Sequence, residues 1–420
     1  MTVVLTSPTH GSYVQRVDLS GHDQPLDPQT NIPRHDGWIY DFFKKVVPLL
    51  PNLTFIQYDG LPTLHPCFYI SPPRVPSLTS LSLSGLNATS IGDVLRLISY
   101  YKRLKELYIT QSGGAWGPFS NHHYSFGQRW SCHLQVLSIQ RCTVSDIFDL
   151  FHWLAQLRTP CSFEHLVLTW GYGRHSRDLE RAPMRSIPEH IALGWARTLK
   201  SLSLDFLLEP DDESPLFKSI LVSRVLPFIK TCSNLHTIRL ASNPDRYEIL
   251  QYLPDVLPSL KSLRRFALRI GRKFDEVLQG ESGERWVALD RVFVDAKKLP
   301  KLQYVEVMWP SNSILRKQER GKTSNTNGDG LNMSDRVSVY VDILKDHFAG
   351  FHLQKPLKSI FPHLSARGIL WYSLFNKAIL GFGGVDSFYA LQISPEISSP
   401  SWRPRYRQSL LDPDLRPDYH

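Results

Sequence analysis

The side chains best suited to hold a metal ion gather between residues 122 and 142, where the chain has His122, His123, Cys132, His133 and Cys142. Zinc prefers imidazole nitrogens and thiolate sulfurs, and structural zinc sites bring these ligands together in compact, regularly spaced pairs. None of those paired spacings occurs in this segment. We therefore expect no metal site here, and we expect Cys142 to be a buried thiol that contributes to packing.

Other sequence patterns that carry chemistry are incomplete. The Gly-Lys-Thr at 321–323 lacks the glycine that a phosphate-binding loop needs five residues earlier, where Arg316 stands instead. The Gly-Phe-Gly-Gly at 381–384 lacks the rest of a dinucleotide fingerprint. The acidic run at 209–213 precedes a predicted helix, whose N-terminus favours negative charge. We expect no enzyme activity and no cofactor, and an enzyme of unrecognised type is the least favoured reading.

The chain as a whole has 420 residues and a formal net charge of +9. Since a compact domain spans about 100–200 residues, this length indicates two domains or one elongated domain. A moderate positive charge permits acidic partners, but aromatic residues do not interleave with the basic ones as in nucleic-acid binders, so no nucleic acid is expected. The longest apolar run is too short for a membrane span. With no secretory signal and five cysteines, the expected location is the cytoplasm or nucleus.

The sequence also contains a repeated apolar motif that predicts a series of short strands. An apolar-x-x-apolar-x-apolar motif recurs ten times at intervals of 25 to 39 residues, at 14–19, 53–58, 78–83, 104–109, 134–139, 163–168, 199–204, 235–240, 263–268 and 302–307. Such a motif is typical of leucine-rich repeats, in which each short strand buries its leucines only by stacking on its neighbours. Helical patterns lie between several motifs, for example at 90–103, 143–157 and 214–228. We therefore predict an α/β leucine-rich-repeat solenoid, horseshoe-like, with parallel strands on the concave face and helices on the convex face.

The predicted organisation has four parts. Residues 1–310 form an array of about ten irregular repeats, 311–334 a polar mobile loop, 335–394 a C-terminal helical cap with a helix at 335–351, and 395–420 a Pro/Arg-rich tail. Insertions follow several strands, and we expect them on one rim beside the concave face, as binding loops or as neutral variation on a tolerant surface. They lie at 111–130, 171–186, 207–215 and 271–284.

Candidate binding residues lie between the buried leucines, because alternate side chains of a strand face opposite sides of the sheet. The central row of this exposed face is Asp18, Gln57, Ser82, Tyr108, Ser138, Val167, Ser203, Arg239, Ala267 and Glu306. Converging arginines suit an acidic or phosphorylated protein segment, although a solvated basic face without a ligand is the alternative. The residues that we select as partner-binding are Tyr108, His165, Arg239, Arg265, Arg269, Arg272, Lys273 and Tyr304.

The repeat segments also resemble a known family. LPNLTFIQYDGL, VPSLTSLSLSGL and YKRLKELYIT, with Trp- and Arg-rich connectors, are similar to the repeat region of fungal F-box/leucine-rich-repeat proteins over about residues 10–310. In that family an N-terminal F-box docks a Skp-type adaptor of a cullin-type ubiquitin ligase, and the repeats hold the protein to be ubiquitylated. No F-box is visible in this chain, so the resemblance implies no adaptor-binding residue.

Two functions remain open. The first is the substrate-recognition part of an F-box-like receptor for a cullin-type ubiquitin ligase, with a Skp-type adaptor as a partner only if an F-box lies upstream. The second is a stand-alone leucine-rich-repeat scaffold without a ligase link. An LPxEL-like helical segment upstream would separate the first from the second.

Overall fold

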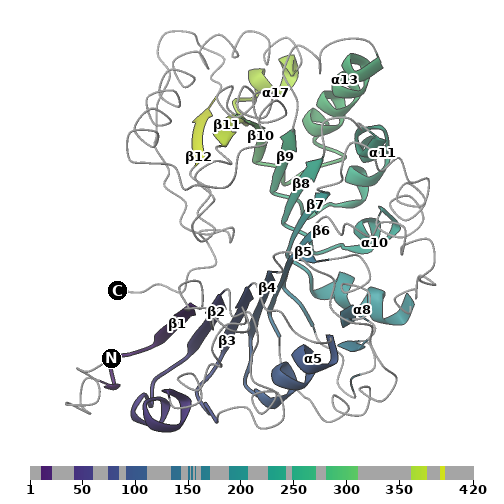
Figure 1. Ribbon diagram of the computed structural model, residues 1–420. Helices are drawn as coiled ribbons and strands as arrows, with labels where there is room; N and C mark the ends of the chain where they lie inside the picture. The colour runs from purple at the N-terminus through teal and green to yellow at the C-terminus, as the bar shows by residue number, and fades with distance from the viewer. Residues whose placement is uncertain are drawn as a thin grey trace, which may run out of the picture. The chain divides into compact units, whose positions relative to one another are not determined.

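The computed structural model describes fifteen parts of the chain and divides the whole chain into two compact units, Met1–Phe217 and Lys218–His420. Each unit has an α/β fold with a parallel sheet (Figure 1). The described residues are 11–20, 42–59, 74–84, 91–110, 134–142, 150–151, 153–154, 157, 162–170, 189–206, 226–242, 248–270, 281–310, 361–375 and 388–392.

In the first unit, neighbouring strands in the sequence are also neighbours in the sheet, and every described pair is parallel. The strands are β1 (Arg16–Ser20), β2 (Phe55–Asp59), β3 (Ser80–Ser84), β4 (Glu106–Thr110), β5 (Val136–Cys142), β6 (His165–Trp170) and β7 (Ser201–Phe206). Helical segments of this unit include the 3-10 turn η1 (Val47–Leu49), α5 (Ile91–Tyr100) and α8 (Glu189–Thr198), and residues 42–45 are also helical.

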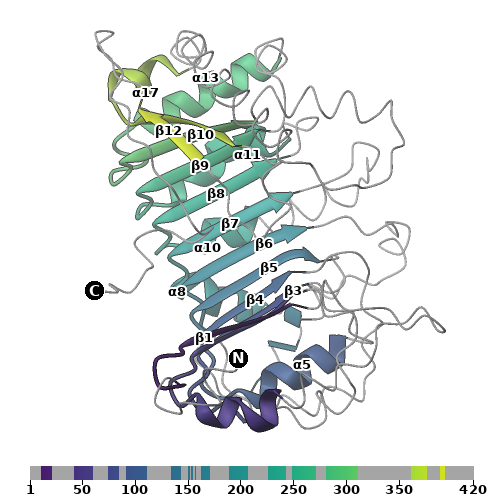
Figure 2. The same cartoon turned by 60° about the vertical axis from the view of Figure 1, so that its left-hand side comes forward.

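The second unit repeats this arrangement, and its helices α10, α11 and α13 lie on one side of its sheet (Figures 1 and 2). Strands β8 to β11 pair in parallel, whereas β12 is antiparallel to β11. The elements in chain order are α10 (Leu226–Thr231), β8 (Thr237–Ser242), α11 (Glu248–Val256), η4 (Leu257–Ser259), β9 (Arg265–Ile270), α13 (Glu281–Val294), β10 (Tyr304–Pro310), α17 (Pro362–Ala366), β11 (Leu370–Phe375) and β12 (Phe388–Gln392).

The register of the sheets aligns equivalent motif positions from strand to strand. In the first unit the middle apolar position forms the row Val17, Ile56, Leu81, Leu107, Leu137, Leu166 and Leu202. In the second unit the same position forms the row Ile238, Phe266, Val305 and Leu370. Apart from Val17, every member of the two rows is at most 3% exposed. Burying a leucine side chain contributes roughly 1.5–3 kcal/mol, so these rows are a main source of cohesion within each sheet.

The backbone repeats the same hydrogen bonds at each step. Two successive N–H groups at the start of a strand donate to one carbonyl oxygen at the start of the preceding strand. For example, Lys105 and Glu106 donate to Thr79 at 2.7 and 3.0 Å, and Gln135 and Val136 donate to Lys105 at 2.7 and 3.0 Å. The pattern continues into β6 and β7 and recurs at β9 and β10. Equivalent residues therefore occupy equivalent positions in successive strands.

Helices cover the leucine side of the sheets with apolar and aromatic side chains. Helix α5 lies within the pattern predicted at 90–103, and its buried residues include Val94, Leu95, Leu97 and Ile98. Trp195 of α8 packs against Phe163, with ring centroids 5.0 Å apart. In the second unit, Phe293 of α13 lies 4.8 Å from the ring of Phe266 in β9.

The C-terminal region differs from the predicted helical cap. Of residues 335–394, the described ones contain one short helix, α17, and two strands, β11 and β12. Strand β11 extends the parallel sheet past Pro310, where the sequence motif ends, because Leu370 takes the buried register position beside Val305. The helix predicted at 335–351, the loop 311–334 and the tail 395–420 lie outside the described residues.

Candidate functional site

The candidate site is the sheet face opposite the helices, and the register places the predicted rows on it. In the first unit the central row runs Asp18, Gln57, Ser82, Tyr108, Ser138, Val167 and Ser203 across adjacent strands. In the second unit Arg239, Ala267 and Glu306 are aligned in the same way. The alternation of the sequence therefore predicted correctly which residues share this face.

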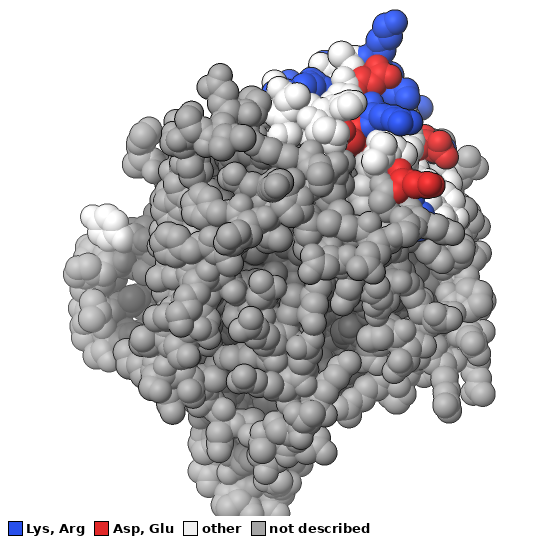
Figure 3. Space-filling model, turned by 90° about the horizontal axis from the view of Figure 1, so that it is seen from above, with Lys and Arg blue, Asp and Glu red and all other residues white. Residues whose placement is uncertain are grey.

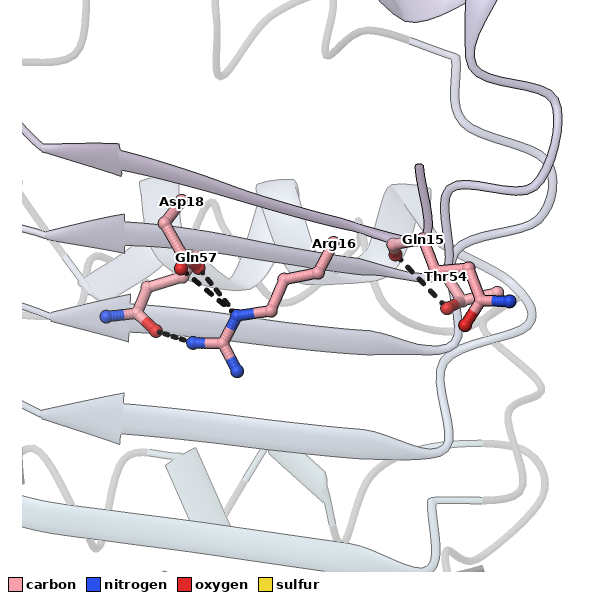
Figure 4. A network of polar contacts seen from close by, with 5 residues as sticks. All are labelled: Gln15, Arg16, Asp18, Thr54 and Gln57. Atoms are coloured by element: carbon pink, nitrogen blue, oxygen red, sulfur yellow. Dashed lines mark hydrogen bonds and ion pairs between the residues drawn. The ribbon is translucent and has the colours of Figure 1, made fainter. Parts of the chain in front are cut away.

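At its N-terminal end the first unit carries a small polar network (Figure 4). The Arg16 Nε donates to both carboxylate oxygens of Asp18 at 2.9 and 3.1 Å, and an Nη2 donates to the Gln57 Oε1 at 3.0 Å. The Arg16 guanidinium also lies 4.3 Å from the ring centre of Phe55. The Arg16 and Asp18 side chains are 58% and 55% exposed, so their ion pair adds little stability. The sequence pattern placed Asp18 and Gln57 on this face, but neither was selected as partner-binding.

Tyr108 stands in the middle of the face of the first unit among small polar neighbours. Its hydroxyl donates to the Glu106 Oε2 at 3.3 Å, and the register places it between Ser82 and Ser138. Burial raises the pKa of the Tyr108 hydroxyl well above its usual value, and the Glu106 carboxylate raises it further. Tyr108 is therefore a neutral hydroxyl at physiological pH, with its ring half-buried on the face.

His165 lies on the predicted face but is only 9% exposed, which leaves little of it for a partner to contact. Its register neighbours are Val136 and Ser201, and its Nε2 is 3.9 Å from the Glu164 Oε2. Ser138 and Val167, which the sequence placed in the central row of this exposed face, are also buried, at 2% and 8% exposed. Because neighbouring strands lie only about 4.8 Å apart, a large side chain on one strand can cover a small side chain on the next. The alternation of apolar and polar residues within one strand does not predict this burial.

The face of the second unit carries the predicted charged residues. Arg265 is aligned with Tyr304, and Arg239 with Ala267, which in turn is aligned with Glu306. Arg239, Arg265 and Tyr304 are partly exposed. Backbone pairing places position 269 beside position 308 on the same face. The side chain of Arg269, and the residues Arg272 and Lys273, lie outside the described residues.

The buried thiols of the described segments contribute to packing. Cys142 is fully buried, as expected, and its Sγ lies 3.5 Å from the Gln140 carbonyl oxygen. Burial raises the pKa of Cys232 to about 12, so this thiol stays protonated at neutral pH and is a poor nucleophile. Within the described segments no group of three metal-ligating side chains is found, while 122–133 lie outside them.

The charge on the described outer surface is mixed. Figure 3 shows basic and acidic side chains interspersed at the end of the second unit that carries α13. Nucleic-acid interfaces depend on a continuous field of positive charge, and this part of the surface does not offer one. No helix in the described part of the chain combines the length and apolar character needed to cross a bilayer.

Comparison with known proteins identifies no relative, since neither a protein-family model nor a curated protein matches this chain.

Proposed function

We propose that the chain is a leucine-rich-repeat solenoid that acts as a protein-interaction module. The observation that carries this proposal is the alignment of equivalent residues from strand to strand within each unit, together with the repeated backbone hydrogen bonds. Such stacking leaves a broad sheet face on which a row of side chains is displayed at regular intervals. A surface of this kind suits an extended protein partner better than a small substrate.

The partner chemistry follows from the side chains displayed. In the second unit Arg239 and Arg265 stand at neighbouring positions, and position 269 adds a third arginine on the same strand as Arg265. Guanidinium groups bind carboxylates and phosphates through paired hydrogen bonds. We therefore propose an acidic or phosphorylated protein segment as the partner.

The biological setting that we propose is substrate recognition for a cullin-type ubiquitin ligase. It rests on the resemblance of the repeat segments to fungal F-box/leucine-rich-repeat proteins. In this setting the sheet face holds the protein to be ubiquitylated, and a Skp-type adaptor is bound through an F-box outside the repeats. A stand-alone scaffold without a ligase link is the second candidate, since no F-box is visible in the sequence.

The two settings are separated by affinity purification of the tagged chain from native extract, with mass spectrometry of the bound proteins. A substrate receptor is expected to recover a Skp-type adaptor and a cullin in addition to candidate substrates. Recovery of partners without an adaptor or a cullin would favour the scaffold. Recovery of no specific partner by the folded chain would contradict the interaction module itself.

The same purification tests the proposed partner chemistry with a charge-reversal variant, Arg265→Glu combined with Arg269→Glu. Arg265 is partly exposed and position 269 lies two residues further along the same strand, so folding should be retained while an acidic partner is lost or reduced at least about tenfold. The matched control is Arg291→Glu, an exposed position on α13, which should leave the recovered proteins unchanged. Equal recovery by the wild type and the double variant would contradict an acidic partner.

A further inference from the structure

The turns that lead into three successive strands of the second unit gather basic side chains at one edge of its sheet. Strands β9, β10 and β11 pair in parallel, so their starting ends lie at the same edge. The turns are residues 260–264, 295–303 and 367–369. Their exposed basic residues, which we call the basic edge, are Lys261, Arg264, Lys297, Lys298, Lys301 and Arg367.

Hydrogen bonds connect these turns, so the basic residues form one cluster. The Lys261 Nζ donates to the carbonyl oxygens of Lys297 and Lys298 at 3.0 and 3.2 Å. The Arg367 Nη1 donates to the carbonyl oxygen of Phe293, in the last turn of α13, at 3.0 Å. All three turns therefore meet at the C-terminal end of α13.

Only part of this positive charge is used within the protein. Cations near a helix C-terminus offset the helix dipole, and Lys261 and Arg367 act in this way at the end of α13. The Lys298 Nζ lies 3.8 Å from the Asp295 carboxylate, which also accepts hydrogen bonds from two backbone N–H groups. Three further side chains form no hydrogen bond and no ion pair within the described part of the chain, namely Arg264, Lys297 and Lys301.

Acidic side chains do not balance the basic edge. Among the described residues, those in or next to the three turns are Asp295 and Asp255, the latter in the last turn of α11. Glu284 lies in the first turn of α13, roughly 15 Å along the helix axis from its C-terminal end. The edge therefore presents an excess of exposed positive charge.

The composition of the edge argues against two classes of anionic partner. The three turns contain no aromatic residue on which a base could stack, and three strand starts about 4.8 Å apart span only about 10 Å, less than the major groove of a duplex. The large apolar side chains that are exposed in the described residues lie elsewhere, at Tyr13, Tyr100 and Val287. A membrane-binding surface combines basic residues with such apolar groups.

We propose that the basic edge binds an acidic segment of a partner protein, in which aspartate or glutamate side chains follow each other closely. Charge complementarity selects this occupant, because carboxylates pair with exposed lysine and arginine side chains and need no preformed cavity. The inference goes beyond the proposed function, which places the partner on the sheet face. It gives the second unit another contact surface at the edge where its strands begin.

The test uses the full chain and a fluorescently labelled oligoglutamate peptide as the probe, with binding followed by fluorescence anisotropy. Lys297→Glu combined with Lys301→Glu should weaken binding about tenfold or more, and Lys297→Gln combined with Lys301→Gln should weaken it less. Binding by the wild type should also fall as salt is raised. Both side chains are exposed, so thermal unfolding should show that the variants remain folded.

The matched control is Lys102→Glu combined with Arg103→Glu, which changes the net charge by the same amount. Both residues are exposed in the turn before β4 of the first unit. This variant should bind the peptide as tightly as the wild type. Equal weakening by the control would show that net charge alone drives binding, and would overturn the basic edge as a site.

The sheet-face variant, Arg265→Glu combined with Arg269→Glu, separates this inference from the proposed function. Loss of the peptide by this variant, with full binding by the Lys297 and Lys301 variants, would overturn the basic edge and leave the sheet face as the acidic-partner site. No peptide binding by the wild type would also overturn the basic edge, while the purification from native extract still decides the interaction module. Tighter binding of duplex DNA or of phosphatidylserine vesicles at the same lysines would overturn the assignment to an acidic protein segment.

Discussion

At the scale of single residues, the most consequential polar group of the second unit's helical layer is Asp290 of α13. It is 2% exposed, and its two carboxylate oxygens accept hydrogen bonds from the backbone N–H groups of His363 and Leu364 at 3.2 and 3.0 Å. These N–H groups belong to the first turn of α17, so Asp290 caps this short helix from another part of the chain. Arg367, just after α17, donates to the Phe293 carbonyl oxygen of α13 at 3.0 Å, a second hydrogen bond between these two helices.

Replacing this cap gives a graded prediction. Asp290→Ala removes both acceptors and should lower the free energy of unfolding by about 1–2 kcal/mol, the usual cost of a lost helix cap. Asp290→Asn keeps one acceptor and should lower it less. Chemical denaturation of the two variants and the wild type at neutral pH measures both differences. Equal stability of all three proteins would contradict the capping role.

The pH dependence at this residue has a defined sign. Burial raises the pKa of Asp290, and the hydrogen bonds from Leu364 and His363 and the nearby His363 charge offset only part of that rise. A group whose pKa is raised on folding stabilises the protein most below its unfolded pKa, and that contribution is lost as the pH rises through the folded pKa. Wild-type stability should therefore decline relative to Asp290→Asn between about pH 4 and neutral pH. A constant difference across this range would contradict the raised pKa.

At the scale of the element, each strand has a leucine side and a display side, and a substitution should act according to its side. Leu202 of β7 is 1% exposed in the buried row, so Leu202→Asp places an unpaired charge in the apolar layer and should unfold the first unit or destabilise it by several kcal/mol. Ser203→Asp, one residue later, points to the display side and should be nearly neutral. Thermal unfolding followed by circular dichroism compares the two variants. Similar melting temperatures for both would show that the register is wrong.

The same alternation explains what the sequence could predict about these elements. The ten strands were found because the apolar motif recurs, and their pairing follows directly from equivalent positions. Strand β11 was not predicted, because Leu370 begins a less regular motif after a long interval. The burial of His165 and Ser138 was not predicted either, because it depends on the size of the side chains on adjacent strands.

At the scale of the whole molecule, two compact units present the same kind of surface. Each has a helix-covered leucine side and a sheet face with a continuous row of displayed residues. The displayed rows differ in character, since the first unit shows serines around Tyr108, and the second shows arginines around Glu306. For the proposed interaction module, we therefore expect charge recognition on the face of the second unit, which carries Arg239 and Arg265.

Binding of a protein partner at the sheet face can be tested by site-specific photo-crosslinking in native extract. A photoreactive residue is placed at Ser82 on the face of the first unit, at Tyr304 on that of the second, or at Val287, which is 42% exposed on α13. Crosslinks to the same partner from Ser82 and Tyr304, and none from Val287, are the predicted result. Crosslinks from Val287 alone would place the partner on the helices and would contradict binding at the sheet face.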